Sequence, residues 1–248
     1  MRYAAKCDMS TIGLVNVPSS TIAREAGNVL PTRAGPEIGV ASTKSFTAQL
    51  TVMLCFAVEL ARAKGRIDNA RVSAIHSEIQ ALPGLVGKTL GLFDTIRPIA
   101  HRLSHAKSAL YLGRGTLYPL ALEGALKLKE LSYIHAEGFA SGEMKHGPIA
   151  LIEDDMPVVA LLSADGLMAK ASSNLREASA RGGNIILIAD ADTLGEVDYA
   201  SAVIAVPSVN PLLAPILLSV PAQILAYLTA LEKGTDVDQP RNLAKSVT

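Results

Sequence analysis

Short apolar runs alternate with longer stretches of helical periodicity along most of this 248-residue chain. The short runs are rich in β-branched residues and are bounded by Gly, Pro, Asn or Ser, as is typical of buried strands. We predict strands at residues 11–17, 29–31, 109–112, 158–162, 184–189 and 203–206. Strands that alternate with helices favour an α/β fold built on a doubly wound parallel sheet.

The periodic stretches predict the helices. A long helix should begin after Ser42 and Thr43, which can cap it, and end at Lys64-Gly65. Its central part, residues 50–61, is the most apolar segment of the chain, but it is too short to span a bilayer and is interpreted as a core helix. The other predicted helices are residues 21–26, 68–81, 86–106, a helix directly after Gly113-Arg114-Gly115, 167–180 and 212–233, with a break at Pro83-Gly84.

An internal near-repeat divides the chain. T-I-G-L-V-N-V, V-L-P and a helix that ends in Lys-Gly match N-I-I-L-I-A-D, V-I-A-V-P and a second helix that ends in Lys-Gly. The second copy follows about 75 residues that have no counterpart before the first copy. We therefore expect the chain to begin within a first domain (residues 1–106), followed by a complete second domain (107–234) and a tail (235–248); an asymmetric single domain is the alternative.

Composition restricts the classes of partner. Lys plus Arg equals Asp plus Glu at 23 each, so no basic field attracts nucleic acid or an anionic membrane, and we expect a small-molecule or protein partner. Cys7 and Cys55 lie in apolar helical patterns without a ligand cluster, which predicts buried thiols in a reducing compartment. The N-terminus shows no signal peptide, so we expect a cytoplasmic protein.

The stretch from Leu122 to Pro148 contains the candidate chemistry. Glu123, Lys127 and Glu130 are spaced four and three residues apart, which places them on one face of a helix. Leucines lie on both sides of this charged stripe, and an unpaired buried charge is costly. The stripe should face a polar cavity, another charged element or water; an ordinary surface Glu–Lys pair is the alternative.

These residues and several motifs resemble a known family. The motifs are L-G-R-G, A-L-E-G-A-L-K-L-K-E, I-H-A-E, G-E-M-K-H-G-P, G-V-A-S-T-K-S-F-T and the terminal G-T-D-V-D-Q-P-R-N-L-A-K-S-V-T. Together they resemble the isomerase part of the glucosamine-6-phosphate synthase family, within the wider sugar-isomerase (SIS) family. The resemblance implies two flavodoxin-like sugar-isomerase domains, each a parallel sheet between helices, of which the first is incomplete here.

The resemblance also implies roles for individual residues. Glu130 aligns with the carboxylate that moves a proton between C1 and C2 of the sugar, and Lys127 and Glu123 with its charged neighbours. His146 aligns with a ring-opening histidine that the neighbouring subunit contributes, and Lys245 with a lysine that forms a Schiff base with the keto-sugar. The positions aligned with sugar contacts are Val40, Ser42 and Ala244. Without the resemblance, Lys245 is an exposed tail lysine and His146 a loop histidine.

This chemistry is coherent with the residue types. A carboxylate can take a proton next to a carbonyl and return it one carbon away. An unprotonated lysine amine can form an imine, and a histidine can transfer the ring-opening proton near neutral pH. We expect no cofactor and no metal: His101 and His105 lie four residues apart, but no third ligand is near them in the sequence.

The family's substrates are fructose 6-phosphate and glucosamine 6-phosphate, and the shared histidine implies a homodimer. The family also has an upstream glutamine-hydrolysing domain and Ser/Thr-rich phosphate loops, which are absent from this sequence. We therefore expect that the chain cannot take ammonia from glutamine by itself and that it binds the sugar phosphate weakly. The alternatives are an amino-sugar-phosphate deaminase and a catalytically silent sugar-phosphate sensor.

Overall fold

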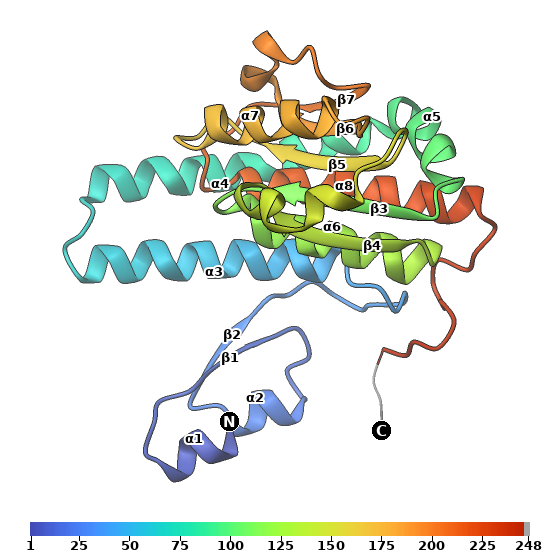
Figure 1. The fold of residues 1–248 in the computed structure, drawn as a ribbon. Coiled ribbons are helices and arrows are strands. Elements are labelled where there is room, and N and C mark those ends of the chain that lie inside the picture. Colours follow the sequence, from blue (N-terminus) through green and yellow to red (C-terminus); the bar gives the residue numbers. More distant parts are fainter. Residues whose placement is uncertain (246–248) are drawn as a thin grey trace. The chain divides into compact units, whose positions relative to one another are not determined.

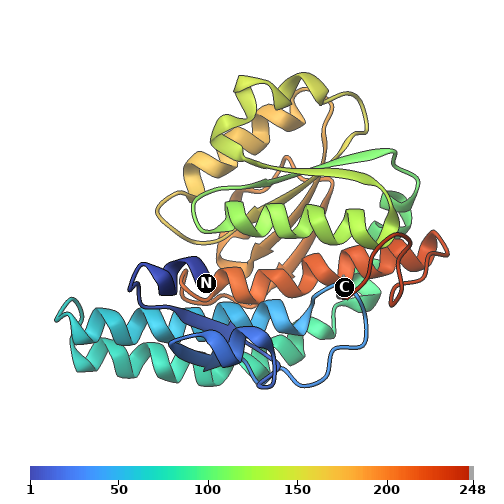
Figure 2. The ribbon, with the colours of Figure 1, turned by 90° about the horizontal axis from the view of Figure 1, so that it is seen from below.

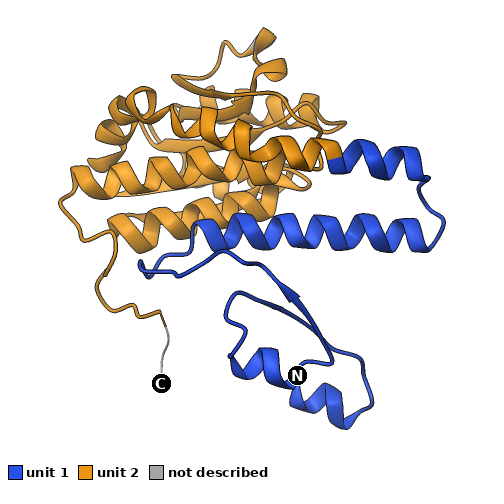
Figure 3. Ribbon diagram, turned by 180° about the vertical axis from the view of Figure 1, so that it is seen from behind, with its two compact units in different colours: residues 1–76 blue, residues 77–248 orange. Residues whose placement is uncertain are grey.

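The computed structural model describes residues 1–245, which divide into two compact units. Unit 1 contains Met1–His76 and unit 2 contains Ser77 and all residues after it (Figure 3). Helix α4 begins in unit 1 and continues into unit 2. The two units are described separately below.

Unit 1 is built on a pair of short parallel strands. Its elements are α1 (Arg2–Lys6), β1 (Ile12–Val15), α2 (Thr21–Glu25), β2 (Asn28–Pro31), α3 (Lys44–Ala63) and the beginning of α4 (Asn69–Leu90). The two strands pair in parallel with Ile12 opposite Asn28 (Figure 1). The strands and the short helix predicted before residue 35 are therefore confirmed, within two residues at each end.

Unit 2 is a five-stranded parallel sheet in the order β4-β3-β5-β6-β7. Its elements after α4 are α5 (Phe93–Ser104), β3 (Ser108–Gly113), α6 (Leu117–Ser132), β4 (His135–Ala140), β5 (Pro157–Leu162), α7 (Met168–Ser179), β6 (Asn184–Asp190), β7 (Ala202–Val206), α8 (Ala214–Glu232) and the 3-10 helices η1 (Ser141–His146), η2 (Pro148–Leu151) and η3 (Ala191–Glu196). The predicted α/β class with a parallel sheet between helices is confirmed.

Successive side chains of each strand point to opposite faces of the sheet, and both faces are buried. Leu110 and Leu112 of β3 belong to a cluster with Leu175 of α7, so α7 covers this face (Figure 1). Tyr111 points to the other face, where its ring lies against Gly124 of α6. Helix α6 packs beside α8 on this face (Figure 2), and α5 packs against α8. Because both faces of the sheet are covered, the central strands are apolar throughout, which is why their short apolar runs were recognisable.

Three predictions about unit 1 and its boundary were wrong. Helix α4 runs through Pro83 without a break, and the chain turns instead at Gly91, between α4 and α5. A proline leaves only the carbonyl four residues before it without its usual bond, and exposed helix positions can tolerate this. Cys7 is exposed and Cys55 only partly buried, so neither is a buried thiol. Thr43 occupies the N-cap position of α3, but its side chain makes no capping hydrogen bond.

Helix α3 is not a core helix. Only Ser45 and Val58 of its 20 residues are buried, and Met53 and Leu60 are exposed. Among the described residues, α3 and α8 are long and apolar enough to cross a membrane. This is weak support for a membrane span, because a core helix of a globular protein passes the same test, and the apolar window of α8 is 78% buried.

Candidate functional site

The charged stripe lies on α6, which follows β3 after a tight turn. Gly113 and Gly115 allow this turn: a Cβ on Gly113 would lie 2.1 Å from the carbonyl oxygen of Leu117, and Gly115 has a φ of 58°. The contact excludes a side chain at Gly113, and the left-handed φ at Gly115 favours glycine. The glycines therefore set the point at which α6 leaves the carboxyl end of the sheet.

Glu123, Lys127 and Glu130 form one ion-paired group, called here the α6 triad. The Lys127 ammonium lies 3.4 Å from Glu123 Oε1 and also contacts Glu130 Oε2. The lysine side chain is 4% exposed, whereas the Glu123 and Glu130 side chains are 16% and 21% exposed. A buried ammonium needs such partners, because the cost of removing an unpaired charge from water is several kcal/mol. The stripe is thus more than an ordinary surface Glu–Lys pair.

The flanks of the triad differ from the expectation. Leu120, Leu128 and Leu131 are buried, as predicted for one flank. Leu122 and Leu126 on the other flank are 43% and 41% exposed. The helix is therefore buried on one side of the triad only.

Burial raises the pKa of the Glu123 carboxyl above its ordinary value, and this effect outweighs the opposing attraction of Lys127. A carboxyl that releases its proton less readily than usual, next to a second carboxylate, is suited to proton transfer. The α6 triad thus joins two carboxylates through one ammonium at a partly exposed surface.

The tail after α8 is attached to the C-terminal end of α6. The Thr235 hydroxyl donates to the Leu131 carbonyl at 2.6 Å, and the Arg241 backbone N–H donates to Tyr133 Oη at 2.8 Å. The Arg241 guanidinium also lies 4.2 Å from the centroid of the Tyr133 ring. We call the Tyr133–Arg241 contact the tail clasp. Tyr133 is the C-cap of α6 and has a left-handed φ of 61°.

The tail clasp lies close to the triad in sequence. Tyr133 is three residues after Glu130, and Lys245 is four residues after Arg241. Four residues span at most about 14 Å when extended, so Ala244 and Lys245 stay within that reach of the clasp. Both are exposed. Sequence reasoning missed the clasp because a contact across 108 residues leaves no local pattern.

The other predicted site residues lie elsewhere. His146 ends η1, which packs against α7, and its side chain is 75% exposed and 3.9 Å from Glu143. It is therefore not part of the triad within one chain. Val40 and Ser42 belong to unit 1, where both are half-buried.

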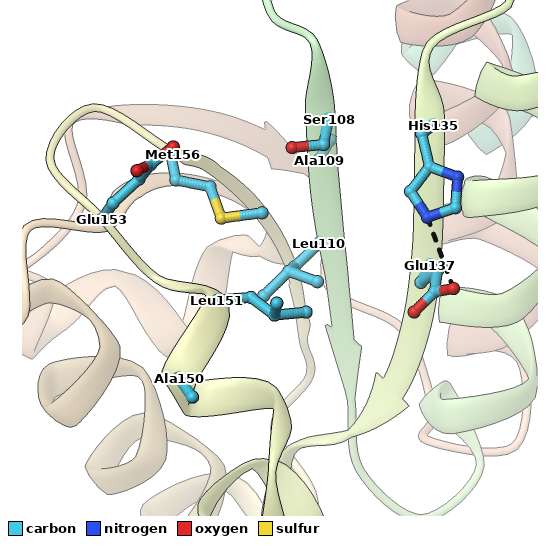
Figure 4. A pocket seen from close by; sticks show the side chains of 9 residues that line it. All are labelled: Ser108, Ala109, Leu110, His135, Glu137, Ala150, Leu151, Glu153 and Met156. Atoms are coloured by element: carbon cyan, nitrogen blue, oxygen red, sulfur yellow. Dashed lines mark ion pairs between the residues drawn. The ribbon is translucent and has the colours of Figure 1, made fainter.

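A cavity of about 390 Å³ is lined in part by His135 and Glu137 of the I-H-A-E motif, and Figure 4 shows its lining residues. Its walls include Ser108 and His135, the first residues of β3 and β4. His135 Nε2 lies 3.4 Å from Glu137 Oε1. The cavity is thus at the amino ends of the strands, whereas α/β sheets bind ligands outside the carboxyl ends. We do not assign the predicted chemistry to it.

Comparison with known proteins identifies the class. The family model described as the SIS domain matches residues 1–59 and 102–233, and the chain belongs to this family. Over its whole length it is 51% identical to a glutamine–fructose-6-phosphate aminotransferase (isomerizing) of Zymomonas mobilis, of which it covers 41%. The chain thus spans about two-fifths of the length of the curated relatives that it matches.

The chain is also similar to solved structures. A structure described as the C-terminal domain of glucosamine-fructose-6-phosphate aminotransferase from Francisella tularensis has a TM-score of 0.93 and 41% identity, and the match covers 96% of this chain and 67% of that one. A glucosamine-6-phosphate deaminase from Thermotoga maritima has a TM-score of 0.73 and 25% identity, with coverages of 98% and 68%. The sequence-based assignment to the SIS family is confirmed.

Proposed function

We propose that the chain is the isomerase part of an enzyme that makes glucosamine 6-phosphate from fructose 6-phosphate and ammonia. The observation that carries this proposal is the 51% identity along the entire chain to relatives named for this activity. The ion-paired carboxylates of the α6 triad and the tail attached beside them supply groups that such a reaction needs.

In the proposed mechanism, Glu130 takes a proton from one of the carbons C1 and C2 and returns it to the other. Lys127 holds the Glu130 carboxylate in place and stabilises its charge, and Glu123 completes the ion pair. The Lys245 amine, carried by the tail, attacks C2 of the open keto-sugar and forms an imine with loss of water. Ammonia then displaces the lysine amine at C2, so the sugar keeps the new nitrogen as an imine and Lys245 is released. The imine makes the neighbouring C–H bond more acidic, which lowers the barrier for Glu130. No step requires a metal or an organic cofactor.

The proposal includes an assembly. The exposure of His146 is what a residue that acts in a neighbouring subunit requires, so we place it at the partner's sugar in a homodimer. Val40, Ser42 and Ala244 contact the sugar. We assign residues 1–106 to a first SIS domain, 107–234 to a second and 235–248 to the catalytic tail; residues 246–248 of that tail lie outside the described part. A glutaminase domain supplies the ammonia, and the enzyme acts in the cytoplasm.

The test is to incubate the chain with fructose 6-phosphate and ammonium and to detect glucosamine 6-phosphate by mass spectrometry. Replacing the proton carrier by Glu130→Gln should reduce turnover by at least about 100-fold, the usual contribution of a positioned acid–base group. The matched control is Glu137→Gln, which changes a carboxylate outside the triad on the edge strand β4. Product formation at the wild-type rate by Glu130→Gln would disprove the role of the triad.

The deaminase alternative has one observation in its favour, the match to the Thermotoga maritima deaminase. Its identity of 25% is well below the 41% shared with the Francisella tularensis structure. Release of ammonia from glucosamine 6-phosphate, together with no detectable synthesis from fructose 6-phosphate, would favour the deaminase.

A further inference from the structure

A second polar cavity of about 360 Å³ lies on the α7 side of unit 2, on the opposite face of the sheet from α6. Its walls contain Arg114, which follows β3, Lys145 of η1, and Lys170, Ser173 and Asn174 of α7. We call it the Arg114 pocket. Glu177 is the only carboxylate among its described lining residues.

The pocket occupies the point of the sheet where ligands are expected. From β3 the chain passes first to β4 on one side, and then to β5 on the other side. In open parallel sheets this reversal leaves a crevice outside the carboxyl ends of the two central strands. Arg114 comes directly after the carboxyl end of β3, and α7 follows β5. The pocket is therefore lined by residues that follow the two central strands, which places it at this crevice.

Arg114 is held in place without a counter-charge. Its Nη1 donates to Asn174 Oδ1 at 3.2 Å, and its guanidinium lies against the backbone of Gly142, where a Cβ would be only 2.6 Å from Nη1. Among the side chains that the structure describes, no carboxylate forms an ion pair with this half-buried guanidinium. Partly buried charges are normally paired, so an anion from outside the chain would satisfy it.

The remaining donors suit the same anion. Lys170 likewise forms no ion pair within the described residues, whereas Lys145 is paired with Glu177 at 2.8 Å. Arg114, Lys145 and Lys170 against Glu177 leave an excess of positive charge, and Ser173 adds a hydroxyl donor. A planar guanidinium with nearby ammonium and hydroxyl groups matches the oxygens of a phosphate group.

We propose that the Arg114 pocket binds the phosphate group of a phosphorylated small molecule. The site is separate from the α6 triad and does not depend on the function proposed above. Arg114 forms the directed contact, Lys170 and Lys145 balance the charge, and Ser173 donates a hydrogen bond.

The test is calorimetric titration of the full chain with inorganic phosphate at low ionic strength. Arg114→Gln should weaken phosphate binding by about 10-fold or more, because a hydrogen bond to a charged group contributes about 1.5–3 kcal/mol. Lys170→Gln should weaken it by a smaller factor. Arg114→Lys, which keeps the charge but loses the planar fork, should fall between the wild type and Arg114→Gln.

The matched control is Lys88→Gln, which removes an exposed helix lysine of unit 2 that does not line the pocket. Equal phosphate affinity of the wild type and of both Arg114→Gln and Lys170→Gln would overturn the proposal. Equal affinity for acetate and phosphate would also overturn it, because a phosphate site should prefer the dianion. Arg114→Gln could unfold the protein because Arg114 contacts Gly142. In that case the phosphate affinities of Lys170→Gln and Ser173→Ala test the proposal, because both residues are exposed and their replacement should leave the fold intact.

Discussion

At the scale of single residues, Tyr111 carries a polar atom that its surroundings do not satisfy. The side chain is fully buried on β3, and within the described structure its hydroxyl has no hydrogen-bond partner. Burial raises the pKa of this phenol well above its ordinary value, so the group stays neutral at any physiological pH. The hydroxyl therefore costs desolvation energy without any compensating bond.

We predict that Tyr111→Phe stabilises the protein by about 1 kcal/mol, because it removes a buried unsatisfied group and leaves the ring in place. Urea denaturation followed by circular dichroism measures the change. Tyr118→Phe on the exposed surface of α6 is the control and should stay within about 0.5 kcal/mol of the wild type. A lower free energy of unfolding for Tyr111→Phe would show that the hydroxyl has a partner in solution.

Glu123 should make stability depend on pH. Its pKa is raised in the folded state, so the folded chain holds this proton more tightly than the unfolded chain. The stability that this proton contributes is present below the ordinary pKa near 4.5 and is lost as the pH rises through the folded-state value.

The free energy of unfolding of the wild type, minus that of Glu123→Gln, should therefore fall as the pH rises from 4.5. Urea midpoints measured between pH 4 and 8 give this difference, with Glu153→Gln as an exposed control. A difference that increases with pH would mean that the attraction of Lys127 outweighs burial.

At the scale of elements, the packing of α6 against the sheet depends on a glycine. A Cβ on Gly124 would lie 2.7 Å from Cε1 of Tyr111, closer than packed atoms approach. We predict that Gly124→Ala destabilises the fold by about 1–3 kcal/mol, because helix or strand must shift.

A glycine in an open helix should behave in the opposite way. Gly87 lies within α4 and has nothing within 4 Å of its would-be Cβ. Gly87→Ala should stabilise by about 0.5–1 kcal/mol, because alanine loses less backbone entropy in a helix. Thermal unfolding of the two variants measures both effects, and the same sign for both would contradict the packing argument.

The tail clasp attaches the tail to α6 partly through one hydrogen bond. Tyr133→Phe keeps the ring beneath Arg241 but removes the acceptor of the 2.8 Å hydrogen bond. One such hydrogen bond contributes about 0.5–1.5 kcal/mol to stability. Its loss should therefore speed amide hydrogen exchange of the described tail by about 2- to 10-fold. Tyr118→Phe on the same helix is the control. Unchanged exchange at Arg241 would show that Thr235 and the ring contact hold the tail without this bond.

The sequence predicted most elements because their patterns are local. The strands of the central sheet are buried on both faces and therefore appear as apolar runs. Strand β4 was missed: it is an edge strand, and of its six residues only Ala136 is buried. The spacing of Glu123, Lys127 and Glu130 predicted the triad, since helix geometry alone brings them together. The exposed flank of α6 and the tail clasp depend on tertiary packing, which no local pattern records.

At the scale of the whole molecule, the two units differ in how many hydrophobic side chains they bury. In unit 1, every residue of which is described, the buried hydrophobic side chains are only Val15, Val58, Val72 and Ile75. Its sheet has two strands of four residues, and a two-stranded sheet is marginal on its own. In unit 2, by contrast, the strands β3, β5 and β6 are almost entirely buried, and so is most of α8.

We therefore predict that the units do not unfold together. Hydrogen exchange read by mass spectrometry should show β1 and β2 exchanging at lower urea concentration than β5 and β6, because local opening is governed by the apolar contacts that must be broken. The strands of unit 2 serve as the internal reference within the same sample. A single coincident transition for all four strands would show instead that unit 1 draws its stability from association, and its dependence on protein concentration would then identify a dimer.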